Sequence, residues 1–92
     1  MSIEERFWAF HESNPKVYQL FDRFTKQVIS RGHTRFSSDA ILHRIRWETN
    51  VETHGDKFKI NDHYSAYYAR MWMDLNPDHD GFFATRELRE AA

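Results

Sequence analysis

Residues 34–49 read TRFSSDAILHRIRWET, and residues 58–75 read FKINDHYSAYYARMWMDL. In the first stretch Ser37 and Ser38 are good candidates for a helix N-cap, and apolar residues follow them at helical spacing. The second stretch begins with a short apolar alternation and continues, after a capping residue such as Asp62, into an aromatic-rich helix. The order strand, helix, connection, helix is typical of the centre of a winged helix-turn-helix domain.

Signals before and after this centre complete the prediction. Asn14 suits an N-cap and Pro15 the first helical position, while Gly32 suits a helix C-terminus. The sequence predicts a single domain over residues 1–92 that is mainly α: a compact helical domain with a small β element and a winged helix-turn-helix-like order. The predicted helices are 3–12, 15–31, 38–49 and 62–75, and residues 76–92 would form a turn, a short strand and a tail. Candidate strands are 34–36, 58–60 and 81–85.

Composition limits the classes of protein that this chain can belong to. Its 92 residues include eight Phe, four Tyr and three Trp, enough large apolar surface for one core. There is no cysteine, which excludes disulfides and thiolate metal sites. The N-terminus carries acids where a signal peptide needs bases, and no apolar run approaches the length of a membrane span. We therefore expect a cytoplasmic protein that does not enter a membrane.

Positive charge is concentrated in the middle of the chain. The net charge is −1, but residues 23–46 carry six Arg and Lys against Asp39 alone, which gives +5. Such local asymmetry predicts contact with the DNA backbone or with an acidic host protein. The alternative is an ordinary solvated helix face. The candidate nucleic-acid-binding residues are Arg31, Arg35, His43, Arg44, Arg46 and Trp47.

A second motif lies after the last predicted helix. Residues 76–87 read NPDHDGFFATRE, which matches the spacing of an EF-hand calcium loop, with oxygen ligands at positions one, three, five and twelve and glycine at six. Calcium would be held by Asn76, Asp78, Asp80 and Glu87. Asn at the first position, Pro77 and the short segment after Glu87 depart from the pattern, so a solvated acidic turn is the alternative.

Catalytic patterns are missing from the sequence. Four histidines, His43, His54, His63 and His79, could ligate a metal, but none belongs to an HExxH motif. There is no glycine-rich phosphate loop and no GxSxG elbow. Without a matched nucleophile, base and orienting group, we expect a protein that is not an enzyme and needs no cofactor.

Several strings resemble small uncharacterised proteins of bacteriophages and prophages: ISRGH at 29–33, SDAILHRIRW at 38–47, FKIND at 58–62, YARM at 68–71 and GFF at 81–83. The resemblance covers about residues 15–90. It implies a phage-type accessory protein, either a small DNA-binding regulator or an inhibitor or adaptor that acts on a host protein.

Two functions from different classes therefore lead. The first is DNA binding through the local basic patch. The second is binding of a host factor through exposed anchors such as Trp8, Trp47 and Met73, because interface hot spots favour aromatic residues. A calcium-binding domain is the third. The sequence predicts no particular oligomeric state.

Overall fold

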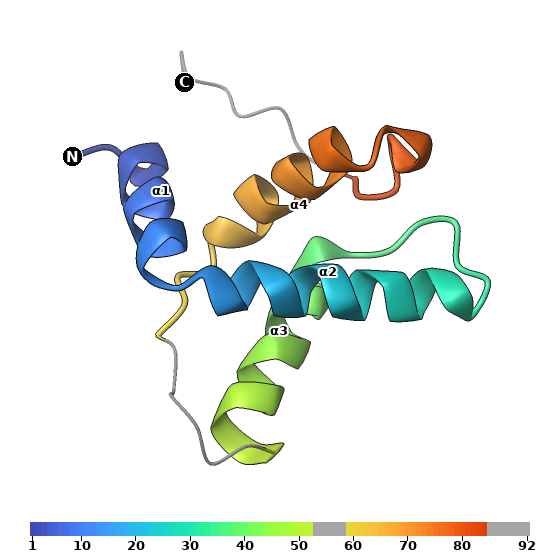
Figure 1. The fold of residues 1–92 in the computed structure, drawn as a ribbon, viewed down its shortest axis with the longest axis horizontal. Coiled ribbons are helices and arrows are strands. Elements are labelled where there is room, and N and C mark those ends of the chain that lie inside the picture. Colours follow the sequence, from blue (N-terminus) through green and yellow to red (C-terminus); the bar gives the residue numbers. More distant parts are fainter. Residues whose placement is uncertain (53–58, 85–92) are drawn as a thin grey trace.

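A computed structural model describes residues 1–52 and 59–84 of the chain (Figure 1). Its described part is mainly helical, as predicted. Within it, no helix combines the length and the apolar character that crossing a lipid bilayer requires. The elements are α1 (Ile3–Ser13), α2 (Pro15–Ser30), α3 (Ser38–Trp47), the π-helix η1 (Glu48–Glu52), α4 (Tyr64–Leu75) and the 3-10 turn η2 (Pro77–His79).

Local signals set the ends of the first two helices. α1 begins with a capping box, in which the Ser2 hydroxyl accepts from the Glu5 N–H and the Glu5 carboxylate accepts from the Ser2 N–H, both at 3.1 Å. Asn14 ends α1 and precedes Pro15, the first residue of α2. α2 ends at Ser30, and Gly32 follows its C-cap, Arg31, with a φ of 93° in the left-handed region that only glycine enters without strain.

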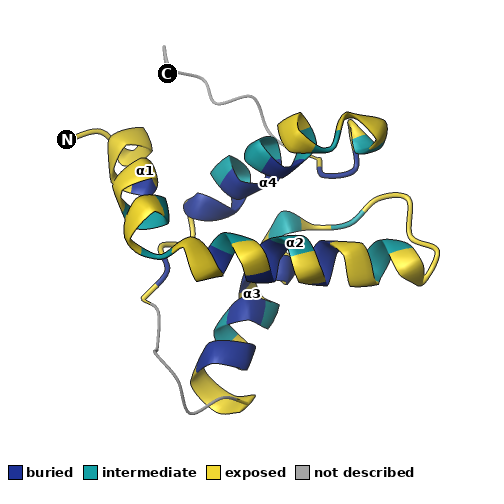
Figure 2. Ribbon diagram, viewed as in Figure 1, coloured by how far each residue is buried: buried dark blue, intermediate teal, exposed yellow. Residues whose placement is uncertain are grey.

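Aromatic and aliphatic side chains from all four α-helices form one core. In Figure 1, α2 crosses in front of α3, and α1 lies at the N-terminal end of α2. α3 packs directly against both α2 and α4. Buried residues follow the facing sides of α2, α3 and α4, whereas α1 is largely exposed (Figure 2). The most deeply buried large side chains are Trp72, Tyr68, Phe7, Phe21, Phe83, Ile41, Leu42 and Ile45.

The predicted small β element is wrong for the residues that the structure describes. Neither 34–36 nor 81–84 forms a strand; one isolated parallel bridge joins Phe36 to Phe83, and the Phe36 N–H donates to Phe82 O at 3.1 Å. The rings of Phe36, Phe82 and Phe83 pack in or against the core, and the two segments do not extend into a β-ladder. Residues 53–58 and 85 of the predicted strands and loop lie outside the described residues.

The apolar face of α4 differs from the stripe of Tyr64, Tyr68, Met71 and Leu75 that helical spacing predicts. Tyr64, Tyr68 and Trp72 line the core at four-residue spacing. Met71 is only half-buried, and Leu75, predicted to continue the core stripe, is 64% exposed. A second row of apolar side chains on α4 thus lies at the edge of the core: Tyr67 and Met71 are half-buried against it, and Leu75 faces outward.

Candidate functional site

Two of the predicted phosphate-binding arginines, Arg44 and Arg46, form ion pairs with carboxylates of the same chain. Arg44 Nη2 lies 3.3 Å from Glu52 Oε2. Arg46 Nη2 lies 2.6 Å from Asp62 Oδ1 and donates to the backbone oxygen of Ile60 at 2.5 Å. Arg46 therefore fastens the segment before α4 onto α3, and a phosphate would have to displace these partners to reach it.

The bases of α2 are paired in the same manner. Arg23 Nη2 lies 3.4 Å from Glu48 Oε1, and Lys26 Nζ lies 3.0 Å from Asp22 Oδ2. Four of the six Arg and Lys residues in 23–46 thus form ion pairs within the chain. These ion pairs reduce the positive potential available to a polyanion. The more exposed of them, such as Lys26–Asp22, contribute little to stability.

The other candidate nucleic-acid-binding residues do not gather at one place. Arg31 and Arg35 are exposed on the connection between α2 and α3 and form no ion pair with any described residue. Trp47, at the far end of α3, is 55% exposed and donates its indole N–H to Glu52 Oε1 at 2.9 Å. His43 lies exposed on α3.

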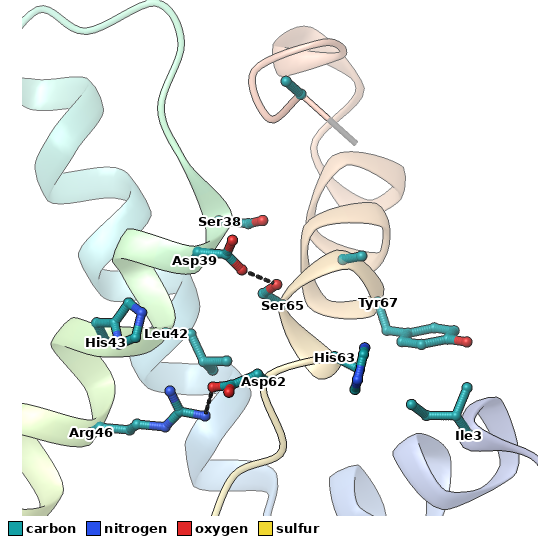
Figure 3. A pocket seen from close by; sticks show the side chains of 12 residues that line it. Ile3, Ser38, Asp39, Leu42, His43, Arg46, Asp62, His63, Ser65 and Tyr67 are labelled. Carbon is teal, nitrogen blue, oxygen red and sulfur yellow. Dashed lines mark hydrogen bonds and ion pairs between the residues drawn. The ribbon is translucent and has the colours of Figure 1, made fainter. Parts of the chain in front are cut away.

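A pocket of about 670 Å³ lies where α3 meets the N-terminal end of α4 (Figure 3). Two contacts cross it. The Ser65 hydroxyl donates to Asp39 Oδ1 at 2.5 Å, and the Arg46–Asp62 ion pair lies farther along the same pocket. His43 is the only other member of the predicted nucleic-acid set on the walls of this pocket.

These contacts make the pocket a joint between two helices. Ser65 is buried, and its hydroxyl donates a hydrogen bond to the Asp39 carboxylate rather than to a histidine ring. His43 lies on the α3 side and His63 at the start of α4 (Figure 3). Among the residues that the structure describes, no group of three or more His, Asp or Glu side chains is placed to hold a metal ion.

The candidate calcium loop is described only in part. Asn76 ends α4 and donates its side-chain N–H to Trp72 O at 2.8 Å, while Asp78 and Asp80 are exposed. Gly81 has a φ of 81°, the left-handed conformation that a glycine permits at the sharp bend of such a loop. Glu87 lies outside the described residues.

An apolar groove lies between α1 and α4, with a volume of about 410 Å³. Trp8 of α1 forms one wall and is 45% exposed. The second apolar row of α4, Tyr67, Met71 and Leu75, forms the other wall. These three residues are spaced four apart, so they follow one side of the helix over about two turns. We call this surface, with Glu4, Arg70 and Asp74 at its borders, the α1–α4 groove.

Neighbouring rings hold Trp8 in position. Its ring centroid lies 5.0 Å from that of Phe7 and 6.1 Å from that of His11, both in edge-to-face geometry. Phe7 is itself fully buried against Tyr67 and Tyr68, with centroid distances of 5.1 and 4.8 Å. The exposed indole is therefore placed by the core, which limits the side-chain entropy that it would lose on binding a partner.

Sequence reasoning named Trp8 as an anchor but missed the α4 wall of this groove. The signal was present, because α4 carries apolar residues on two adjacent sides: 64, 68 and 72 on one, and 67, 71 and 75 on the other. A helix with one apolar stripe needs one neighbour, whereas a broader stripe has surface left over. The other two proposed anchors lie apart from the groove: Trp47 on α3, and Met73 half-buried against the core.

Comparison of the chain with models of protein families, with curated proteins and with solved structures finds no match in any of the three.

Proposed function

We propose that this chain is a protein-binding module whose binding surface is the α1–α4 groove. The observation that carries the proposal is the exposure of Trp8 and Leu75, 45% and 64%, on the two walls of one apolar groove. Single exposed apolar residues are ordinary on protein surfaces, but a contiguous group that includes an exposed tryptophan is typical of interaction sites.

The charge distribution supports this function over DNA binding. Four of the six bases in residues 23–46 already have carboxylate partners within the chain. The resemblance to bacteriophage and prophage proteins implies either a small DNA-binding regulator or an inhibitor or adaptor, and in the second case the partner would be a host protein. Burial of the groove surface against the partner would be sufficient for binding.

A capture experiment with matched variants tests the proposal. Tagged wild-type protein is incubated with nuclease-treated lysate of the cell in which it is made, and bound proteins are identified by mass spectrometry. We expect one partner that is retained by wild type and by Trp47→Ala but lost with Trp8→Ala and with Leu75→Ala. Trp47 is a fair control because it is also exposed but lies on α3. A partner that is lost with Trp47→Ala and kept with Trp8→Ala would place the interface elsewhere.

One observation favours DNA binding as a second candidate function. Arg31 and Arg35 are both exposed on the α2–α3 connection, without an ion pair in the described part of the chain. Two phosphate contacts would give a slope of about −2 in a plot of log K against log salt. A gel-shift series across salt, with Arg31→Ala/Arg35→Ala as the variant, tests this function; no shift at low salt excludes it.

Calcium binding is a third candidate, supported by the left-handed Gly81 at the sixth position of the loop that begins at Asn76. A ligand that binds only the folded state raises the melting temperature by mass action. The melting temperature would therefore rise with calcium relative to chelator, and Asp78→Asn/Asp80→Asn would abolish the rise. An unchanged melting temperature would exclude a calcium site.

A further inference from the structure

We propose that the α1–α4 groove binds an amphipathic α-helix of the partner, one whose apolar stripe is flanked by lysines or arginines. This inference rests on the function proposed above and specifies the chemistry of the partner. Three features of the groove carry it: the direction of its walls, the nature of the backbone behind them, and the charge at its borders.

The walls run along two helices. Glu4 and Trp8 are one turn apart on α1, and Tyr67, Met71 and Leu75 follow α4 over two turns, about 12 Å. A groove of this length accommodates apolar residues at positions i, i+4 and i+7 of an incoming helix. Trp8 and Leu75 lie on opposite walls, so one apolar stripe can contact both of them.

The backbone behind the walls favours a helical partner over an extended one. An extended peptide gains much of its affinity by pairing with the free edge of a sheet. Both walls of the groove are α-helices, whose backbone groups are bonded within the helix, and the described residues contain no β-strand that a peptide could extend. Side chains alone must therefore provide the contacts, as they do when a helix lies in a groove.

Two of the three charged residues that line the groove are acidic, one on each wall. Glu4 lies on the α1 border and Asp74 on the α4 border, and neither forms an ion pair with a described residue. Arg70, the basic residue at the border, already has an interaction of its own. A helix with Lys or Arg beside its apolar stripe would place a cation near each carboxylate, whereas Asp or Glu there would be repelled.

Designed peptides test the charge and the shape separately. The probe is a fluorescein-labelled helical peptide of about five turns, with leucines along one face and lysines beside them. One control carries glutamate in place of every lysine, and another has the lysine peptide's composition in an order without an apolar face. Binding to the full chain is measured by fluorescence anisotropy, and circular dichroism confirms that each protein variant is folded.

We expect the lysine peptide to bind wild type, and the scrambled peptide not to bind. Trp8→Ala and Leu75→Ala each weaken binding by about thirtyfold, the effect of an interface hot spot, while Trp47→Ala has no effect. Glu4→Gln/Asp74→Asn weakens it by about threefold to tenfold and lowers its salt dependence. The glutamate peptide binds more weakly than the lysine peptide.

Two results overturn the inference, and they differ in what they leave standing. Equal binding of the glutamate and lysine peptides, or no effect of the Glu4 and Asp74 substitutions, would show that the charge assignment is wrong while the groove still binds helices. Failure of the lysine peptide to bind, or binding that Trp8→Ala leaves unchanged, would end the helical assignment. The capture experiment with Trp8 and Trp47 variants then decides the proposed function independently.

Discussion

Trp72 shows how a single side chain joins two helices of the core. It is fully buried in α4, and its indole N–H donates to Asp22 Oδ1 of α2 at 2.9 Å. Asp22 also pairs with Lys26 through its other oxygen. The hydrogen-bonding group of a core tryptophan is thus satisfied by a carboxylate that the sequence alone would place on the solvated side of α2.

Replacing Trp72 by phenylalanine is expected to lower the free energy of unfolding by about 2 kcal/mol, because a buried hydrogen bond and part of a ring are lost together. Urea denaturation measures the change. In a double-mutant cycle with Asp22→Ala, the double variant should lose less unfolding free energy than the two single variants lose in total, because either substitution breaks the same bond. Strict additivity would mean that this bond does not stabilise the fold.

Arg46 and Arg35 were equivalent in the sequence prediction but are not equivalent in the structure. Arg46 holds Asp62 and the Ile60 carbonyl, whereas Arg35 is exposed without an ion pair in the described residues. Both partners of Arg46 lie after η1 and shortly before α4, so they come near it only once α3 and α4 have packed. Sequence spacing alone could not reveal this pairing, and the same holds for Arg44 and Glu52 across η1.

Arg46→Ala should therefore destabilise the protein by about 1–3 kcal/mol, while Arg35→Ala should change stability by less than about 0.5 kcal/mol. Thermal denaturation of the two variants at neutral pH makes the comparison. Equal melting temperatures would contradict a structural role for Arg46. The result also decides how DNA-binding variants are interpreted, because loss of binding by Arg46→Ala could reflect unfolding.

At the scale of elements, the helix signals were more informative than the strand signals. The Asn14-Pro15 and Gly32 boundaries and the apolar residues of α2 could be read directly, since caps and helical periodicity are local. The strand predictions rested on stretches of three to five residues, too short for alternation to outweigh the burial of Phe36, Phe82 and Phe83. On α4, two apolar rows fitted the helical period equally well, and only packing against α2 and α3 selects the buried one.

The capping box of α1 should make this helix sensitive to acid. The backbone hydrogen bond from Ser2, followed by the contact with the Ser2 side chain, lowers the pKa of Glu5 below its ordinary value of 4.5. A lowered pKa in the folded state means that the stabilisation is complete above the ordinary value and is lost as pH falls through the folded value. Because α1 carries Trp8, acid should loosen one wall of the groove.

We expect Glu5→Gln to melt below wild type at pH 7 and to match it at about pH 2, well below the ordinary pKa of 4.5. Hydrogen exchange of the first-turn amides of α1 measures the effect locally. Glu4→Gln is the matched control, because Glu4 is in the same turn but takes no part in the capping box. A Glu5→Gln difference that persists at pH 2 would contradict an ionised capping carboxylate.

At the scale of the whole molecule, four of the six bases in residues 23–46 are paired internally, while Trp8 and Leu75 are left exposed on the walls of an apolar groove. The sequence indicated both the basic segment and Trp8, yet it could not show which of them the fold would leave available. Four ion pairs, two of them between residues far apart in the sequence, decide whether the basic segment is available. The rotation of α4 in the core decides what Trp8 faces. The positive charge of residues 23–46 is real, but the fold pairs most of these bases with carboxylates. The charge asymmetry therefore favours DNA binding less than the sequence alone indicates.

The most direct test of this account is amide hydrogen exchange of the chain, free and with its captured partner or the lysine peptide bound. The account predicts new protection along both walls of the α1–α4 groove, around Trp8 and from Tyr67 to Leu75, with no change at 31–35 or at Trp47. Protection confined to 31–35 or to the end of α3, with the groove unchanged, would contradict it.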